Sequence, residues 1–288
     1  MLPKGSLERA TLELFEAADL AVSRSSAVDY RGSVDDPRIE EVKILRPQEI
    51  PTYVAEGLFD LGITGRDWIA ETGADVVSLG ELHYSKATAR PIRMVLAVAG
   101  DSKAQRVSDL PGGVRVSTEY PRLTERFFAE HGVAADVRLS YGATEAKVPD
   151  IVDAVVEITE TGRALRAAGL RVIDTILVSY TELVANPASH ADPERRHAMG
   201  QLQTLLRGTL EARGRVLVKL NVGEADLDGV IALLPSLRSP TVSRLFSSEH
   251  DFAVETVVPK AEINTLIPAL RDAGASDIIE LPIAKIVH

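Results

Sequence analysis

One segment in the middle of the chain combines the residue types that hold a sugar phosphate. A run of Val, Ile and Ala over residues 151–158 carries two carboxylates, Asp153 and Glu157, and leads into a Glu-Thr-Gly turn at 160–162. Residues 163–168 favour a helix. A strand, a tight turn and a helix present free backbone N–H groups to a phosphate, and carboxylates beside the turn suit ribose hydroxyls. The pattern predicts a ribose 5-phosphate site; the alternative is an ordinary turn that binds nothing.

The elements around this segment indicate an α/β fold. An apolar run without alternation, such as 151–158, is typical of a strand buried on both faces of a parallel sheet. Strand-turn-helix units also begin at 42–45, 61–65 and 76–79. Successive units of this kind predict parallel sheets with helices on both faces, whose ligands lie at the carboxyl ends of the strands.

Four residues of the first part of the chain fall at such strand ends. Lys4, with Gly5 and Ser6, precedes an amphipathic helix and could bind a phosphate or nucleotide, but this pattern alone favours an ordinary helix capped by Ser6. Only a few residues precede Lys4, so the first strand is missing or very short. The other residues at strand ends are Arg46, Thr64 and Gly65.

Composition excludes several classes of function. The 288 residues have a net charge of -10, which disfavours general nucleic-acid binding. No apolar run has membrane-spanning length, and the N-terminus lacks a signal-peptide pattern. The absence of cysteine excludes disulfides, thiolate metal sites and cysteine nucleophiles, and fits a cytoplasmic protein. The six histidines lack metal-site spacing, which argues against structural zinc.

The order of elements predicts three parts. Residues 1–90 form a first lobe to which 181–213 return, and 91–180 form a second lobe that contains the phosphate segment. From 214 to 288 the pattern is β-α-β-β-α-β, the ferredoxin-like arrangement. A small appendage of this kind suggests regulation or assembly; a packing domain without a ligand is the alternative.

Six motifs in order resemble one family, the long form of ATP phosphoribosyltransferase, the first enzyme of histidine biosynthesis. They cover nearly the whole chain and are individually weak but together specific: 2–7 (LPKGSL), 46–51 (RPQEIP), 62–65 (GITG), 118–121 (TEYP), 153–165 and 237–241 (LRSPT). The resemblance implies a two-lobed catalytic body like a type II periplasmic binding protein, plus a C-terminal ferredoxin-like, ACT-like domain.

The resemblance also implies the reaction. ATP and phosphoribosyl pyrophosphate would give phosphoribosyl-ATP and pyrophosphate, with Mg²⁺, in a cleft between the lobes. Adenine N1 is already a nucleophile, so positioning and electrostatics should carry the rate, without a general base or covalent intermediate. We expect Mg²⁺ on the pyrophosphate oxygens because the sequence shows no all-protein cage, and its protein ligands stay unknown.

On this basis each site residue receives an expected role. The 5-phosphate is assigned to the backbone of Glu160, Thr161, Gly162, Arg163, Ala164 and Leu165, although the family often carries a hydroxyl residue where this chain has Ala164. Asp153 and, more weakly, Glu157 are expected at the ribose hydroxyls, and Glu145 at the ribose or a metal-bound water. The expected groups around ATP or pyrophosphate are Lys4, Gly5, Ser6, Arg46, Thr64, Gly65, Asp67 and Lys86, although solvation explains Lys86 equally well.

For the last domain the resemblance implies histidine as feedback inhibitor at a subunit interface, in a hexamer built from dimers. The residues that fall there are Asn221, Thr241, Val257 and Asp277; ordinary strand-end residues are the alternative.

Two other functions remain open. An inactive regulatory paralogue would bind nucleotide without turnover. A two-lobed solute-binding protein would share the fold, but it normally has a signal peptide and does not need a phosphate turn beside carboxylates.

Overall fold

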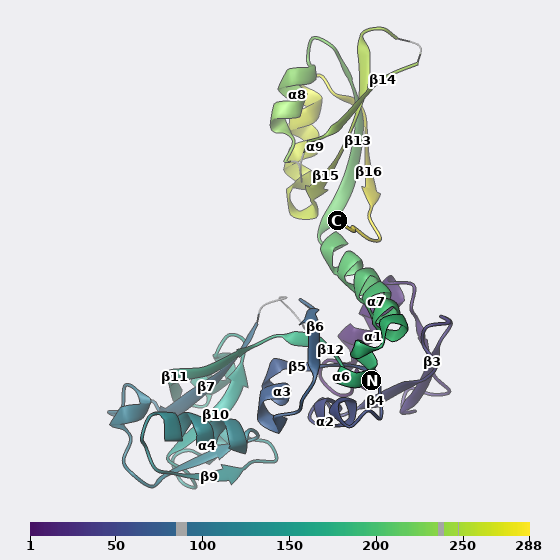
Figure 1. Ribbon diagram of the computed structural model, residues 1–288. Helices are drawn as coiled ribbons and strands as arrows, with labels where there is room; N and C mark the ends of the chain where they lie inside the picture. Colours follow the sequence, from purple (N-terminus) through teal and green to yellow (C-terminus); the bar gives the residue numbers. More distant parts are fainter. Residues whose placement is uncertain (85–90, 236–238, 247) are drawn as a thin grey trace. The chain divides into compact units, whose positions relative to one another are not determined.

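The computed structural model describes residues 1–84, 91–235, 239–246 and 248–288 (Figure 1). The chain divides into two compact units, Met1–Gln203 and Thr204–His288, and helix α7 (Pro193–Ala212) contains the division. Within these described ranges, every helix is too short or too polar to cross a membrane.

The first lobe is built on strands from the start of the chain and one returning strand. Strand order is β2-β3-β4-β1, with β1 parallel to β4, and β5-β12-β6, with β12 antiparallel to both neighbours. Ile63 N donates to Met1 O at 3.0 Å and joins the two sets. The strands are β1 (Leu2–Pro3), β2 (Val22–Ser23), β3 (Arg31–Val34), β4 (Val42–Leu45), β5 (Leu61–Gly65), β6 (Val77–Glu81) and β12 (Thr181–Ala185). The first strand is therefore present but only two residues long.

The second lobe is built on one five-stranded sheet, in the order β11-β7-β10-β8-β9. Strand β10 is parallel to β8 but antiparallel to β7, so the sheet is mixed and the expectation of a purely parallel sheet was wrong. The strands are β7 (Ile92–Ala99), β8 (Val114–Thr118), β9 (Ala135–Leu139), β10 (Ala154–Thr159) and β11 (Leu170–Ser179).

In both lobes the antiparallel strand is the one that enters from the other lobe. Strand β7 begins lobe II after the chain leaves lobe I, and β12 lies between β5 and β6 after the chain returns. This matching order in two lobes is the predicted type II periplasmic-binding-protein architecture.

Helices cover both faces of the lobe II sheet. Met94, Leu96, Val116 and Phe128 pack in one cluster with α4 (Pro121–Glu130), whereas Val155 packs with residues around α5 (Arg163–Ala167) on the other face. Both faces of the first half of β10, Ala154 to Val156, are thus buried, as the apolar run without alternation predicted. The remaining helices of unit one are α1 (Glu8–Ala17), α2 (Ile50–Ala55), α3 (Arg66–Thr72) and α6 (Pro187–Ala191), with one-turn 3-10 helices η1 (Val107–Asp109) and η2 (Thr144–Lys147).

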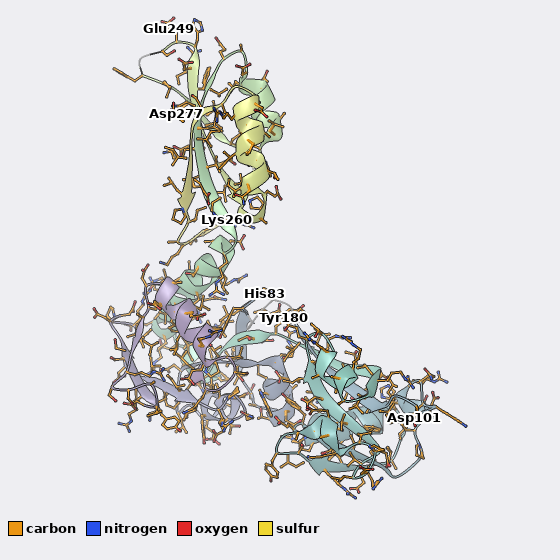
Figure 2. All side chains as sticks on the ribbon, turned by 180° about the vertical axis from the view of Figure 1, so that it is seen from behind. His83, Asp101, Tyr180, Glu249, Lys260 and Asp277 are labelled. Carbon is orange, nitrogen blue, oxygen red and sulfur yellow. The ribbon has the colours of Figure 1, made fainter. Side chains whose placement is uncertain are left out.

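The last domain has the predicted β-α-β-β-α-β order. Its antiparallel sheet runs β14-β15-β13-β16, with Val218, Val254 and Leu270 in a core between the sheet and its helices. The opposite face of β13 carries half-buried residues such as Lys219 and Asn221. Its elements are β13 (Arg215–Gly223), α8 (Leu227–Leu233), β14 (Thr241–Arg244), β15 (Asp251–Pro259), η3 (Lys260–Glu262), α9 (Ile263–Asp272) and β16 (Ser276–Pro282). Asp277 and Lys260 lie at opposite ends of this sheet (Figure 2).

Candidate active site

The phosphate segment lies at the carboxyl edge of lobe II, where β10 ends. Gly162 follows this strand with φ 71°, a left-handed conformation that suits glycine. Its N–H donates to Thr159 Oγ1 at 2.7 Å, and Arg163 N–H donates to Thr161 Oγ1 at 3.4 Å. The N–H groups of Gly162 and Arg163, which were expected to be free for a phosphate, therefore already have hydroxyl acceptors within the turn.

Two further donors follow this turn. The first bond of α5 runs from Arg166 N to Gly162 O at 3.0 Å, so the N–H groups of Ala164 and Leu165 precede the intrahelical ladder. Helix α5 has only 5 residues. Local N–H groups, rather than a long helix dipole, are thus what this turn offers an anion.

The two predicted ribose carboxylates lie apart. Asp153 precedes the amino end of β10 and accepts bonds from Arg115 N, Nε and Nη2 at 2.9, 3.1 and 2.7 Å. Arg115 holds the pKa of Asp153 below its ordinary value. Four residues of strand, roughly 13 Å, separate it from Glu157. The structure does not bring Asp153 to the turn, because neighbouring β8 supplies Arg115 as its partner.

Glu157 does lie near the carboxyl end of β10, and other acids surround it. Burial raises its pKa; hydrogen bonds from Ile158 N–H and the Thr144 hydroxyl act against that rise, and the charges of Glu119 and Glu145 add to it. Glu145 is on η2, which packs beside this strand. The structure therefore groups Glu157 and Glu145, as predicted, and adds Glu119.

At the edge of lobe I, Lys4 and Arg46 follow adjacent parallel strands. Lys4 Nζ lies 3.7 Å from the centroid of the Tyr30 ring, a cation–π contact. Arg46 is exposed. Gly5 has φ 91°, and Ser6 is exposed without capping α1, whose N-cap is Leu7. The alternative of a helix capped by Ser6 was wrong, since Glu8 accepts from Gly5 N instead, at 3.4 Å.

Of the three residues predicted to line the cleft from lobe I, Gly65 and Asp67 line a pocket between the lobe edges, whereas Thr64 does not. Thr64 is fully buried and donates to Pro47 O at 2.8 Å, so the structure gives its hydroxyl no access to the cleft. Asp67 is buried and accepts bonds from Tyr120 Oη at 2.8 Å and Ser179 Oγ at 2.7 Å. Gly65 leaves room for this carboxylate, because a Cβ there would lie 2.0 Å from Asp67 Oδ1. Lys86 lies outside the described residues.

A pocket with about 920 Å³ of empty space, part of it open to solvent, lies between the edges of the two lobes. Its lining is mostly apolar and aromatic, and it includes Glu160 of the phosphate turn and Ser6 of lobe I. The other lining residues are Leu7, Pro47, Gly65, Asp67, Trp68, Leu82, His83, Tyr84, Ile92, Ile158, Ser179, Tyr180 and Thr181. An apolar pocket with few polar groups suits a flat organic ring.

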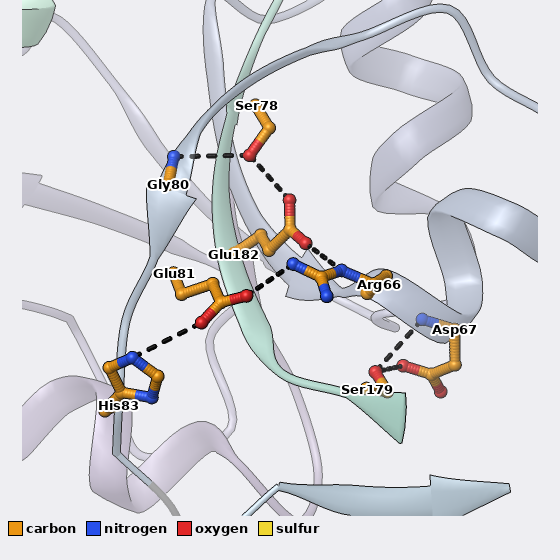
Figure 3. A network of polar contacts seen from close by, with 8 residues as sticks. All are labelled: Arg66, Asp67, Ser78, Gly80, Glu81, His83, Ser179 and Glu182. Carbon is orange, nitrogen blue, oxygen red and sulfur yellow. Dashed lines mark hydrogen bonds and ion pairs between the residues drawn. The ribbon is translucent and has the colours of Figure 1, made fainter. Parts of the chain in front are cut away.

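A charged network that the sequence reading missed supports one wall of this pocket (Figure 3). Arg66 donates to Glu182 at 2.6 Å and to Glu81 at 2.5 Å, and these bonds raise the pKa of Arg66 against the effect of burial. Glu81 also pairs with His83, whose ring lies edge-on to Tyr180 at 5.2 Å. The sequence offered one signal for this network, the carboxylate of Glu182 within the otherwise mostly apolar run 181–185.

In the last domain the expected effector residues fall into separate positions. Asn221 Nδ2 donates to Asp277 Oδ2 at 2.9 Å, and Asp277 has φ 49°. Thr241 on edge strand β14 is opposite Glu255, whereas Val257 is opposite Leu217, four residues along β13 from Asn221. The structure brings Asn221 and Asp277 together and leaves the other two further along the sheet.

Among the residues that the structure describes, no three His, Asp or Glu side chains are gathered closely enough to hold a metal ion by themselves.

Comparison with known proteins decides the family. The model of the family "ATP phosphoribosyltransferase" matches residues 46–208, and that of "HisG, C-terminal domain" matches 212–285. The chain belongs to the ATP phosphoribosyltransferase family. An ATP phosphoribosyltransferase of Pelotomaculum thermopropionicum is 50% identical over 286 residues, covering 99% of this chain and 98% of that protein. One from Desulforudis audaxviator is 48% identical over 288 residues, covering 99% and 98%.

A solved structure agrees with this family. The "ATP phosphoribosyl transferase (HisG:HisZ) complex from Thermotoga maritima" is 27% identical, with a TM-score of 0.61, and the match covers 73% of this chain and 96% of that chain. Membership of this transferase family was predicted from the six motifs and is confirmed.

Proposed function

We propose that this chain transfers the 5-phosphoribosyl group of phosphoribosyl pyrophosphate to N1 of ATP and releases pyrophosphate. The observation that carries the proposal is 50% identity, over 99% of the chain, to a protein named for this activity. The C1–pyrophosphate bond breaks and the C1–N1 bond forms, so positive charge develops on the sugar and negative charge on the leaving group. Groups that position and stabilise these charges can carry such a reaction.

Phosphoribosyl pyrophosphate is assigned to the edge of lobe II. The N–H groups of Ala164 and Leu165, which precede the helical hydrogen bonds of α5, would bind the 5-phosphate, and those of Gly162 and Arg163 would have to exchange their hydroxyl acceptors for it. Glu157 accepts from the ribose hydroxyls, with Glu145 beside it. Asp153 is left out of this assignment because Arg115 engages it at the other end of the strand.

ATP is assigned to the pocket between the lobes and to the cations at the edge of lobe I. The apolar and aromatic lining suits the adenine ring, and Lys4 and Arg46 suit the phosphates. Ser6 and Gly65 line this pocket and Gly5 lies between Lys4 and Ser6, so the backbone of these residues would contact the nucleotide; Lys86 remains a candidate from sequence.

The metal ion of the reaction is proposed to be Mg²⁺. The charges of Glu119 and Glu145 raise the pKa of Glu157 at the lobe II edge, and carboxylate oxygens are the donors that Mg²⁺ prefers. Glu145 would reach the ion through water. When bound, the ion would neutralise charge on the departing pyrophosphate.

The last domain is proposed to bind histidine as a feedback inhibitor, with Asn221 and Asp277 as its polar contacts. Catalysis would come from the two lobes, which are residues 1–90 with 181–213 and residues 91–180. Regulation would come from residues 214–288. The chain would act in the cytoplasm as a homo-oligomer, from dimer to hexamer.

The test is formation of phosphoribosyl-ATP, followed by absorbance, from ATP, phosphoribosyl pyrophosphate and Mg²⁺ with pyrophosphatase present, with and without histidine. Turnover that histidine suppresses supports both assignments. Turnover that histidine does not change would support the transferase activity and contradict the regulatory role of the last domain. Ligand binding without turnover would favour an inactive nucleotide-binding paralogue.

A further inference from the structure

Lys147, at the end of η2, has an environment that the proposed function does not use. Its ammonium donates to Ser140 Oγ at 2.6 Å and to Ser117 Oγ at 3.3 Å. Lys147 is half-buried, and both serines are buried. Among the described side chains, no carboxylate forms an ion pair with it. A half-buried ammonium held by hydroxyls alone is unusual, because such charges normally have an acidic partner.

The hydroxyls continue from Lys147 towards the proposed ribose carboxylate. Ser140 Oγ lies 2.8 Å from Thr144 Oγ1, and Thr144, on η2 packed against β10, is close enough to Glu157 for its hydroxyl to lower the pKa of that carboxylate. Thr144 is buried. Because Lys can only donate and a carboxylate can only accept, a Thr144 hydroxyl turned to Glu157 must accept from Ser140, whose Oγ also lies 3.3 Å from a second acceptor, Gly142 O.

The folding of the lobe fixes this chain of hydroxyls. Ser117 on β8 is paired with Val155 on β10, so its side chain lies on the same face of the sheet as that of Glu157, two residues further along. Residues 140–147 follow β9 and cross this face, which brings Lys147 onto Ser117. The ammonium thus lies on the side of the sheet where Glu119, Glu145 and Glu157 repel one another.

We propose that Lys147 is a positioning residue, which orients the Glu157 carboxylate for the ribose through Ser140 and Thr144. The inference rests on the proposed role of Glu157. In this relay the Thr144 hydroxyl is turned to the Glu157 carboxylate, whose Oε1 also accepts from Ile158 N at 3.0 Å, so two protein donors fix the orientation of the carboxylate. Direct contact of Lys147 with a substrate phosphate is the competing explanation.

A double-mutant cycle in the full-length protein separates the two. Lys147→Met and Glu157→Gln are made singly and together, and KM is measured for each substrate. We expect Lys147→Met alone to raise KM for phosphoribosyl pyrophosphate about tenfold and to leave KM for ATP within about twofold. In the Glu157→Gln background its further effect should fall below about twofold, since the group it orients is gone. Thr144→Val, which keeps every charge, should reproduce the effect of Lys147→Met.

If Lys147→Met raises KM by the same factor in the wild-type and Glu157→Gln backgrounds, the relay is overturned. Lys147 would then contact the substrate directly or serve only in folding. Lys43→Met, another half-buried lysine, on β4, is the matched control and should behave as wild type. If Lys147→Met does not fold, Thr144→Val decides: a wild-type KM overturns the relay. Glu157→Gln without effect would refute the ribose assignment, whereas absence of turnover in the wild type would refute the proposed function.

Discussion

The carboxylate of Asp67 accepts a hydrogen bond from the hydroxyl of Tyr120 at 2.8 Å, and this bond joins α3 of lobe I to lobe II. Both side chains are buried, and the indole of Trp68 lies 4.3 Å, centroid to centroid, from the Tyr120 ring. Burial and the charge of Asp67 raise the pKa of Tyr120, so its hydroxyl stays protonated and donates. Helix α3 is therefore attached to both lobes.

Tyr120→Phe should lower the free energy of unfolding by about 1–3 kcal/mol, because Asp67 loses a donor in a buried position. Urea denaturation measures the change. Tyr141→Phe removes a hydroxyl from a ring that is 93% exposed and serves as the control. Equal stabilities of the two variants would contradict the role of this bond.

Glu71→Ala should lower the free energy of unfolding by about 0.5–2 kcal/mol, the usual effect of losing a helix cap. Glu71 accepts from Arg122 N at 3.0 Å and Leu123 N at 2.8 Å, the first N–H groups of α4. Thermal unfolding should show a lower Tm than that of Glu130→Ala, an exposed change on α4 itself. An unchanged Tm would mean that water replaces the cap.

Asp153→Asn and Glu157→Gln should differ in their effect on substrate. Because the Arg115–Asp153 pair is about 40% exposed (39% and 43%), Asp153→Asn should cost only about 0–1 kcal/mol of stability. Its KM for phosphoribosyl pyrophosphate should stay within about twofold of wild type, whereas Glu157→Gln should raise it about tenfold. The reverse ranking would restore Asp153 to the ribose site.

The raised pKa of Glu157 predicts a pH dependence of stability. Between the unfolded and folded pKa values the native state binds more protons, so the free energy of unfolding falls as pH rises. Glu157→Gln removes this loss. The variant should therefore be more stable than wild type at neutral pH, with a difference that shrinks as pH falls through the raised pKa. Urea denaturation across pH tests this, with exposed Glu125→Gln as control; parallel profiles for Glu157→Gln and wild type would contradict it.

Asn221→Ala should weaken inhibition by histidine without changing turnover in its absence. Loss of one hydrogen-bonding group raises the inhibitory concentration about tenfold. Lys260→Met, at the other end of the same sheet (Figure 2), is the control. Unaltered inhibition in Asn221→Ala would place the effector elsewhere.

Much of the architecture could be predicted from sequence periodicity. Val216, Val218, Leu220 and Val222 alternate with half-buried residues along β13, and all four are buried, so a period of two marks the core face of this strand. The apolar run around Val155 likewise indicated a strand covered on both faces. Strand direction was not available in this way, because β7 and β12 receive their antiparallel neighbours from the path of the chain rather than from local pattern.

The site was predicted less completely, for a physical reason. Asp153 and Glu157 were both expected at the ribose hydroxyls, but β10 begins only at Ala154, so Asp153 lies at the amino end of the strand and Glu157 near its carboxyl end. Arg115 on the neighbouring strand pairs with Asp153 there. Thr64 and Asp67 were likewise taken up by partners distant in sequence, Pro47, Tyr120 and Ser179, which no local motif reveals.

The position of β12 also determines which lobe completes its sheet first during translation. This strand lies between β5 and β6, yet it is made only after all five strands of lobe II. On the ribosome, lobe II therefore has its full complement of strands while the sheet of lobe I still has a gap between β5 and β6. The N-terminal lobe, although translated first, is the later of the two to close, and a nascent chain stalled before residue 181 exposes two unpaired strand edges to whatever binds them.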